Sequence, residues 1–166
     1  LGPSGGTYAA NRTLSGRHEL RVEYYEASGL ASLWFDIAGY NQSPAWQAEY
    51  FANTALAGPP SVVQQEPRSS STPLARDWGY GSAATGVPAD LWSARWSGNF
   101  AFEAGDYIFH AISDDGVRVS IDGLRVIDQW RDGYRQRCAG QTRPRHQQAY
   151  HRAAPGDEPV RQQHDV

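Results

Sequence analysis

The feature that most constrains the fold is a pair of alternating apolar runs on either side of an acidic turn. In residues 107–112 and 117–121, apolar side chains recur at every second position, as in Val117, Val119 and Ile121. Side chains two positions apart lie on the same face of a β-strand, so both runs are typical of half-buried strands. Between them stands Ser113-Asp114-Asp115-Gly116. The pattern predicts a β-hairpin with two adjacent carboxylates at its tip.

The composition favours an all-β domain. The chain has 166 residues, of which 12% are aromatic, with six Trp and nine Tyr, and it contains 17 Gly and 10 Pro. Aromatic residues are enriched in strands, and Gly and Pro are enriched in turns. This length suits one domain with a sizeable core together with some additional segments. We therefore expect a turn-rich β protein and exclude a helical bundle.

Charge and hydropathy exclude several classes of partner. The net charge is −3, the pI is near 5.9, and many of the arginines lie in the last 40 positions, so we expect no nucleic-acid partner. No apolar run approaches the roughly 18 residues of a membrane span, so we expect no membrane insertion. A single cysteine, Cys138, excludes an intrachain disulfide and leaves the redox compartment open. The chain begins at Leu1, which indicates a fragment or a processed product.

The order of patterns along the chain predicts three parts. Residues 1–38 contain two strand-like runs around the turn Ser15-Gly16-Arg17 and a third run that begins at Leu30. A polar, turn-prone boundary follows at residues 39–44. Residues 45–134 then restart the strand pattern, and residues 135–166 lose apolar periodicity, so we expect a tail of low order there.

The middle part contains a long predicted loop from Arg76 to Asp90, which includes Trp78 and Tyr80. Loops of this length in compact domains are often functional, or they are held in place by aromatic side chains. Two interpretations therefore remain open for this loop. In the simpler one, Trp78 and Tyr80 cover one end of the domain.

Several motifs together resemble the protective-antigen-type domain, a family first described in anthrax protective antigen and shared with yeast flocculins and with bacterial surface proteins and glycosidases. The resemblance covers residues 45–134 and implies an antiparallel, jelly-roll-like β-sandwich. It rests on these blocks: Trp46-x-Ala48-Glu49-Tyr50-Phe51-Ala52-Asn53-x-x-Leu56-x-Gly58-x-Pro60, Asp77-Trp78-Gly79-x-Gly81, Ser93-Ala94-Arg95-Trp96-Ser97-Gly98, Ser113-Asp114-Asp115-Gly116-Val117-Arg118-Val119-x-Ile121-Asp122-Gly123 and Val126-Ile127-Asp128-x-Trp130.

Residues 1–38 form a unit that resembles the C-terminal end of the same family. Thr13 to Glu26 is similar to the family's final hairpin, which normally follows the block at 126–130. These residues either finish a preceding tandem copy or complete this domain as in a circular permutant. The tail 135–166 lacks the hairpin motif, and it is either native or the product of a shifted reading frame.

The resemblance implies a calcium site at the acidic turn. In the sugar-binding members, a pair of aspartates joined by a cis peptide binds calcium, and the calcium holds two sugar hydroxyls; Asp114 and Asp115 match this pair by position. The family's second ligand loop corresponds to Glu26 to Leu30, which adds Glu26 and Ser28 as sugar-binding candidates. Trp130 is a further candidate, since an indole can stack on a sugar ring. The alternative is that Ser-Asp-Asp-Gly is an ordinary hairpin turn.

The residues predict no catalytic centre. Glycoside hydrolysis needs two carboxyl groups about 5–9.5 Å apart across a sugar, whereas Asp114 and Asp115 are adjacent on one turn. Asp128 and Asp132 are spare carboxylates that need no function. We therefore expect a non-catalytic, calcium-dependent carbohydrate-binding module of a secreted or cell-surface multidomain protein, for example an accessory module of a glycoside hydrolase. The alternative is a structural spacer in a tandem array. The partner of the carbohydrate-binding module would be a glycan or polysaccharide, whereas the spacer would bind no sugar. A strand-swapped dimer would form if the tether at 39–44 were too short.

Overall fold

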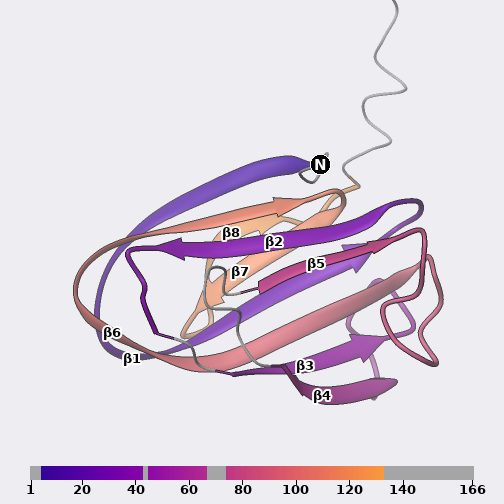
Figure 1. Ribbon diagram of the computed structural model, residues 1–166, viewed down its shortest axis with the longest axis horizontal. Helices are drawn as coiled ribbons and strands as arrows, with labels where there is room; N and C mark the ends of the chain where they lie inside the picture. Colours follow the sequence, from indigo (N-terminus) through magenta and orange to yellow (C-terminus); the bar gives the residue numbers. More distant parts are fainter. Residues whose placement is uncertain (1–4, 43–44, 67–73, 133–166) are drawn as a thin grey trace, which may run out of the picture.

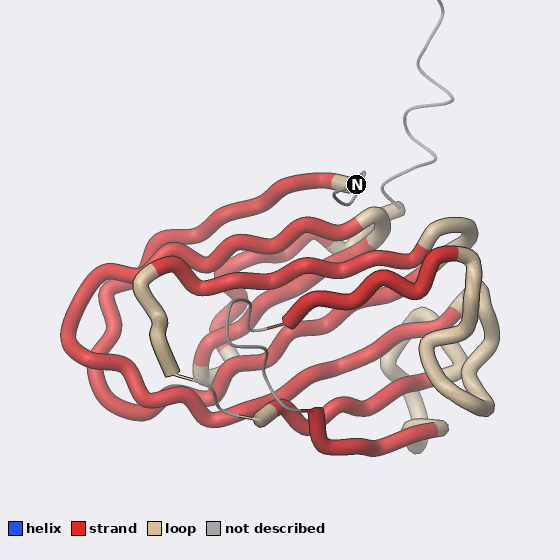
Figure 2. Tube along the Cα trace, in the orientation of Figure 1, coloured by secondary structure: helices blue, strands red, loops and turns tan. Residues whose placement is uncertain are grey.

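The computed structural model describes residues 5–42, 45–66 and 74–132, and the expected tail at 135–166 lies outside these ranges (Figure 1). All regular secondary structure in the described residues is β-strand (Figure 2). The all-β prediction is therefore confirmed. The strands are β1 (Gly6–Glu26), β2 (Ala31–Ala38), β3 (Trp46–Phe51), β4 (Val62–Glu66), β5 (Leu74–Gly79), β6 (Trp92–Ser113), β7 (Gly116–Ile121) and β8 (Leu124–Gln129).

Two long strands, β1 and β6, form the frame of the domain. They pair antiparallel from Gly6 opposite Ser113 to Glu26 opposite Trp92, with one register shift between Leu14 and Gly16. Both strands bend at the same end of the molecule (Figure 1). The turn predicted at Ser15-Gly16-Arg17 is therefore wrong, because the chain continues through it as one strand. Gly16 has φ 86°, a left-handed conformation that glycine adopts without strain and that suits a bulge.

The bend divides both long strands between two layers of a sandwich. The first half of β6 and the second half of β1 lie in a sheet with the order β4-β3-β6-β1-β7-β8, whereas the other halves pair with each other and continue through β2 to β5. Aromatic side chains fill the space between the layers. The ring of Phe35 in β2 lies 6.2 Å from that of Trp46 in β3, and Trp78 in β5 lies 4.9 Å from Trp92 in β6.

The strands around the acidic turn were predicted correctly, but their pairing was not. β6 and β7 are not neighbours in the sheet, because the second half of β1 lies between them and pairs with both. Alternation of apolar residues identifies strands and their faces but does not say which strands are adjacent. The acidic turn is therefore not a hairpin tip. It connects the end of β6 in one layer to β7 in the other.

The predicted loop at 76–90 also needs a correction. Its first residues belong to β5, and the connection to β6 starts only after Gly79. Trp78 packs between the layers, with ring contacts to Tyr24, Trp92 and Trp96, which agrees with the simpler interpretation of that tryptophan. Tyr80 does not share this role, since it is 76% exposed.

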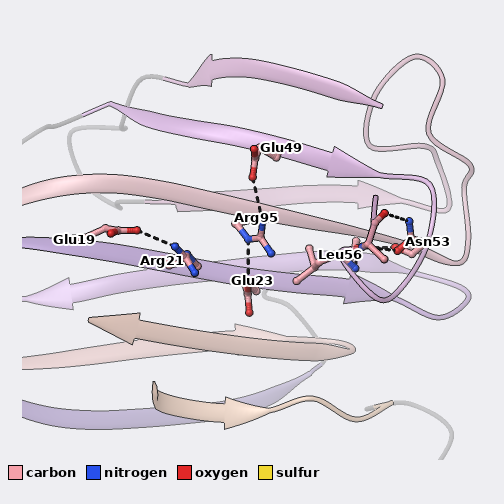
Figure 3. A network of polar contacts seen from close by, with 9 residues as sticks. Glu19, Arg21, Glu23, Glu49, Asn53, Leu56 and Arg95 are labelled. Carbon is pink, nitrogen blue, oxygen red and sulfur yellow. Dashed lines mark hydrogen bonds and ion pairs between the residues drawn. The ribbon is translucent and has the colours of Figure 1, made fainter. Parts of the chain in front are cut away.

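A row of alternating charges crosses the outer face of the larger sheet. Cross-strand partners in this row are Glu49, Arg95, Glu23, Arg118 and Asp128, from β3, β6, β1, β7 and β8 in turn. Arg95 donates to Glu23 over 3.1 Å and to Glu49 over 3.4 Å, which ties β6 to both of its neighbours (Figure 3). Opposite charges on directly opposed strand positions stabilise one register.

We predict that Arg95→Ala lowers the free energy of unfolding by about 1–2 kcal/mol. The Glu23 side chain is only 11% exposed and would lose its cationic partner, while partial hydration keeps the loss below the ~3–5 kcal/mol of a fully buried pair. Urea unfolding measures the change. The control is Arg125→Ala, whose pair with Asp128 is half exposed and should contribute under about 0.5 kcal/mol. Equal losses in both variants would contradict the assignment.

We also predict that a chain starting at residue 45 does not fold. Without β1, the backbone edges of β6 and β7 would lose their hydrogen-bonding partner, and the core would lose Leu20, Val22 and Tyr24, all fully buried. The control chain starts at Gly5 and should keep the full melting transition. A cooperative melt of the shorter chain near the midpoint of the control would contradict this prediction.

Candidate functional site at the layer-crossing end

Two connections cross from one layer to the other at the same end of the sandwich, and they lie side by side. Residues 27–30 lead from β1 to β2, and Asp114 and Asp115 lead from β6 to β7. The backbone N–H of Ala27 donates to Asp115 Oδ2 over 2.8 Å, and the N–H of Ser32 donates to Asp114 Oδ1 over 2.9 Å. Asp115 therefore holds the β1–β2 connection and Asp114 holds the start of β2, each through a backbone hydrogen bond.

The glycine that ends the acidic turn is required for close packing. A Cβ on Gly116 would lie 2.0 Å from the ring of Tyr25, its cross-strand partner in β1. No side chain fits at such a distance, so only glycine allows the Tyr25 ring to lie across the strand. Gly116, which is typical of an ordinary turn, is therefore also required by its packing against Tyr25.

A buried carboxylate stands on the core face of β1, next to Asp114. The alternation that places Leu20, Val22 and Tyr24 inward continues to Glu26, which is 0% exposed. The Tyr24 hydroxyl lies 2.7 Å from Glu26 Oε2 and 2.9 Å from Asp114 Oδ1. One hydroxyl proton can serve only one of these two acceptors at a time. Glu26 Oε1 is buried without a hydrogen-bond partner.

Burial and mutual repulsion shift the acidity of this cluster. Burial, reinforced by the charges of Asp114, Asp115 and Asp90, raises the pKa of Glu26 to about 8, although the hydrogen bond from Tyr24 opposes the shift. Burial also raises the pKa of Asp114 against the hydrogen bonds from Ser32 and Tyr24. The pKa of the Tyr24 phenol is raised as well, first by burial and then by the two neighbouring carboxylates. The cluster is therefore costly to keep fully ionised.

The donor set suits a hard cation in charge and atom type. Calcium prefers six to eight oxygen ligands, and carboxylates with unused oxygens are its common protein ligands. Among the described residues, Glu26 and Asp114 have no arginine partner within salt-bridge distance, and the Glu26 Oε1 atom has no partner at all. In the same ranges, no three His, Cys, Asp or Glu side chains already converge with metal-binding geometry, and no peptide bond is cis. Cation binding would therefore need the carboxylates to reorient.

The other predicted site residues lie at different places around this cluster. Ser28 is exposed in the β1–β2 connection. Trp130 follows β8 and lies 4.8 Å from the ring of Tyr25, with the Arg118 guanidinium 4.1 Å above its own ring. Asp132 accepts a 2.6 Å hydrogen bond from the Tyr25 hydroxyl, whereas Asp128 pairs with Arg118 and Arg125 in the charged row away from the cluster.

Sequence reasoning missed Tyr24, Tyr25 and Asp90 as parts of the site. Leu20, Val22 and Tyr24 alternate along the sequence, and the same alternation, continued by two positions, places the Glu26 carboxyl on an apolar face. Asp90 accepts a 3.0 Å hydrogen bond from the N–H of Gly29 and so joins the β5–β6 connection to the β1–β2 connection. No signal in the sequence indicated that contact, because the two residues are far apart along the chain.

Comparison with known families adds an independent observation. Residues 42–153, about two thirds of the chain, match the family described as the PA14 domain, a β-sandwich related to anthrax protective antigen. The match includes Asp114 and Asp115 but not β1 or β2, which contribute Tyr24 and Glu26. The match does not test whether β1 and β2 are a displaced C-terminal hairpin, and that remains a prediction.

A curated relative places a similar segment in a much larger protein. The chain is 38% identical over 56 residues to the anti-sigma-I factor RsgI3 of Acetivibrio thermocellus. That alignment covers 33% of this chain and 9% of the relative. No solved structure matches the chain. Within the described residues, no helix is long and apolar enough to cross a membrane.

We predict that Glu26→Gln flattens the pH dependence of stability. With the pKa of Glu26 raised from 4.5 to about 8, the folded state holds this proton more tightly than the unfolded state. The contribution of Glu26 to stability is therefore greatest below pH 4.5 and is lost as the pH rises towards 8. The loss should be at least about 1.4 kcal/mol, the value of one pKa unit.

Urea midpoints across this pH range, in the presence of a chelator, measure the effect as the difference between wild type and variant. The control is Glu103→Gln at an exposed position of β6, which should follow the wild-type curve. A Glu26→Gln curve parallel to wild type would mean that Glu26 is ionised throughout this range.

Proposed function

Because this chain belongs to the PA14 domain family, we propose that it is a non-catalytic, calcium-dependent carbohydrate-binding module of a secreted or cell-surface multidomain protein. PA14 domains are often carbohydrate-binding parts of multidomain proteins. The observation that carries the calcium part of the proposal is Glu26, a fully buried carboxylate with one oxygen lacking a partner, beside Asp114 and Asp115.

Calcium would be held by Asp114 and Asp115, with Glu26 as a third carboxylate. A divalent cation would offset the repulsion that raises the pKa of Glu26 and Asp114. When bound, the ion supplies open coordination positions that sugar hydroxyls can fill. The chain's own residues hold the two connections together through the hydrogen bonds to Ala27 and Ser32, so the same contacts position both sides of the site.

The arrangement supports binding and not hydrolysis. The carboxylates at this end lie close together and accept hydrogen bonds from Tyr24, Ala27 and Ser32. Glu26 and Asp114 both contact the Tyr24 hydroxyl. Glycosidases instead place an acid and a nucleophile or base on opposite sides of a sugar ring. The residues around the acidic turn therefore suit a ligand that is held and not cleaved.

The competing proposal is a structural spacer or interaction domain without sugar binding. It is favoured by the small share of the anti-sigma-I factor that the alignment covers, 9%, since a short domain in a long chain can serve as a spacer. A spacer has no use for a buried carboxyl group with an oxygen that lacks a hydrogen-bond partner, because burying such an atom costs free energy of folding. Glu26 therefore favours the binding module over the spacer.

We predict that calcium chloride raises the melting temperature and that the double variant Asp114→Asn, Asp115→Asn abolishes the shift. A ligand that binds only the folded state adds about 2.7 kcal/mol at 100 times its dissociation constant. The matched control is Asp128→Asn, which removes a carboxylate from the charged row and should keep the full calcium shift. A shift of the same size in the double variant would place the ion elsewhere.

The sugar part has its own measurement. The wild-type domain should be retained on a glycan array in calcium chloride and released by a chelator. A calcium-induced thermal shift without retention of any glycan would favour the spacer, with calcium as a structural ion. Retention that persists in chelator would contradict the role of calcium.

A further inference from the structure

A hollow of about 360 Å³ opens on the outer side of the layer-crossing end, next to the acidic turn. Its lining comes from five separate parts of the fold, namely β1, the β1–β2, β3–β4 and β5–β6 connections, and the segment after β8. The lining residues are Tyr25, Ala27, Thr54, Leu91, Trp130 and Asp132. This volume lies at the lower end of the roughly 300–1,000 Å³ typical of small-molecule sites.

The hollow and the acidic cluster share one wall. Ala27 lines the hollow, and its N–H donates to Asp115 Oδ2 over 2.8 Å. Tyr25 lines the hollow and follows Tyr24, which faces the cluster from the opposite side of the same strand. The charge of Asp115 also contributes to the raised pKa of Tyr25, after burial and Asp132. The acidic turn and the hollow are therefore neighbours at the end of β1.

The lining combines aromatic, aliphatic and hydroxyl or carboxylate groups. Tyr25 and Trp130 meet at 57°, and the Tyr25 hydroxyl is fixed by its 2.6 Å hydrogen bond to Asp132. Arg118 above the Trp130 ring fixes the indole from another side. A neutral sugar carries both apolar C–H faces and hydroxyl groups. The rings of Tyr25 and Trp130 suit the C–H faces, and the Asp132 carboxylate and the Thr54 hydroxyl suit the sugar hydroxyls.

Backbone strain marks one wall of the hollow. Leu91 has φ 59°, a left-handed conformation that is costly for leucine, and its side chain is 63% exposed. Strained residues persist where the surroundings enforce them, and they concentrate at ligand sites. The preceding Asp90, bonded to Gly29, holds the backbone beside it. An exposed leucine in a strained conformation contributes little to the core, so a contact with a ligand accounts for it better.

We propose that this hollow is a second sugar subsite, which holds the unit next to the sugar bound at the acidic turn. The module would then select a neutral oligosaccharide or polysaccharide over a single sugar. This inference rests on the proposed function, since the first unit of the oligosaccharide must be bound at the acidic turn.

The test measures how affinity depends on the length of the sugar chain. The probes are neutral gluco-, manno-, galacto- and xylo-oligosaccharides of one to four units, on an array and by calorimetry in calcium chloride. Wild type should bind the longer members of one series roughly tenfold more tightly than the single sugar, the gain expected from contact with one or two apolar side chains. The variant Leu91→Gly should lose this gain while it keeps or raises the melting temperature, because glycine relieves the strained φ.

The matched control is Leu124→Gly at the first residue of β8, a similarly exposed leucine at 67%, which should keep the dependence on length. A second variant, Trp130→Phe, removes part of the ring surface with a smaller risk to folding and should reduce the gain. Affinity that is independent of length in wild type, or a full gain in Leu91→Gly, would overturn the subsite alone. Absence of binding to every probe by wild type would overturn the proposed function together with the subsite.

Discussion

The pairing of β1 with β6 is the constraint on which the rest of the structure depends. The two strands are 21 and 22 residues long, and each contributes to both layers. Because they bend together, one continuous antiparallel ladder fixes how the two layers face each other. The shift between Leu14 and Gly16 lets the ladder turn without ending. Every other strand is added to an edge of this ladder or to a strand already paired with it.

This frame also explains why acidic residues are buried at one end. Both β1 and β6 finish their second halves there, and each must connect to a strand in the opposite layer. The two connections meet and exchange hydrogen bonds through Asp114 and Asp115, so these aspartates are not at a hydrated hairpin tip. Glu26 is drawn into the same region because it continues the core face of β1. The clustering of carboxylates thus follows from topology, and their repulsion is what a bound cation would relieve.

Local sequence patterns predicted the strands well but not their neighbours. Alternation correctly predicted strands at 107–112 and 117–121. It could not show that β1 would insert between β6 and β7, because pairing depends on contacts between residues about a hundred positions apart. The Asp-Asp pair was evident as a candidate from composition and family resemblance. Its partners Tyr24, Ala27 and Ser32 were not, since they approach it only after the layers assemble.

Several groups that hold the acidic turn lie outside the segment that matches the family. The match starts at residue 42, whereas Tyr24, Glu26, Ala27 and Ser32 all lie before it. The matched segment alone therefore contains the two aspartates without the groups that orient and desolvate them. Since β1 is also one of the two central strands of the larger sheet, the segment that completes the fold is the same one that completes the site. A chain of this family in which these strands come from elsewhere, whether from its own C-terminus or from another copy, would build the same cluster only if the equivalents of Tyr24 and Glu26 came with them.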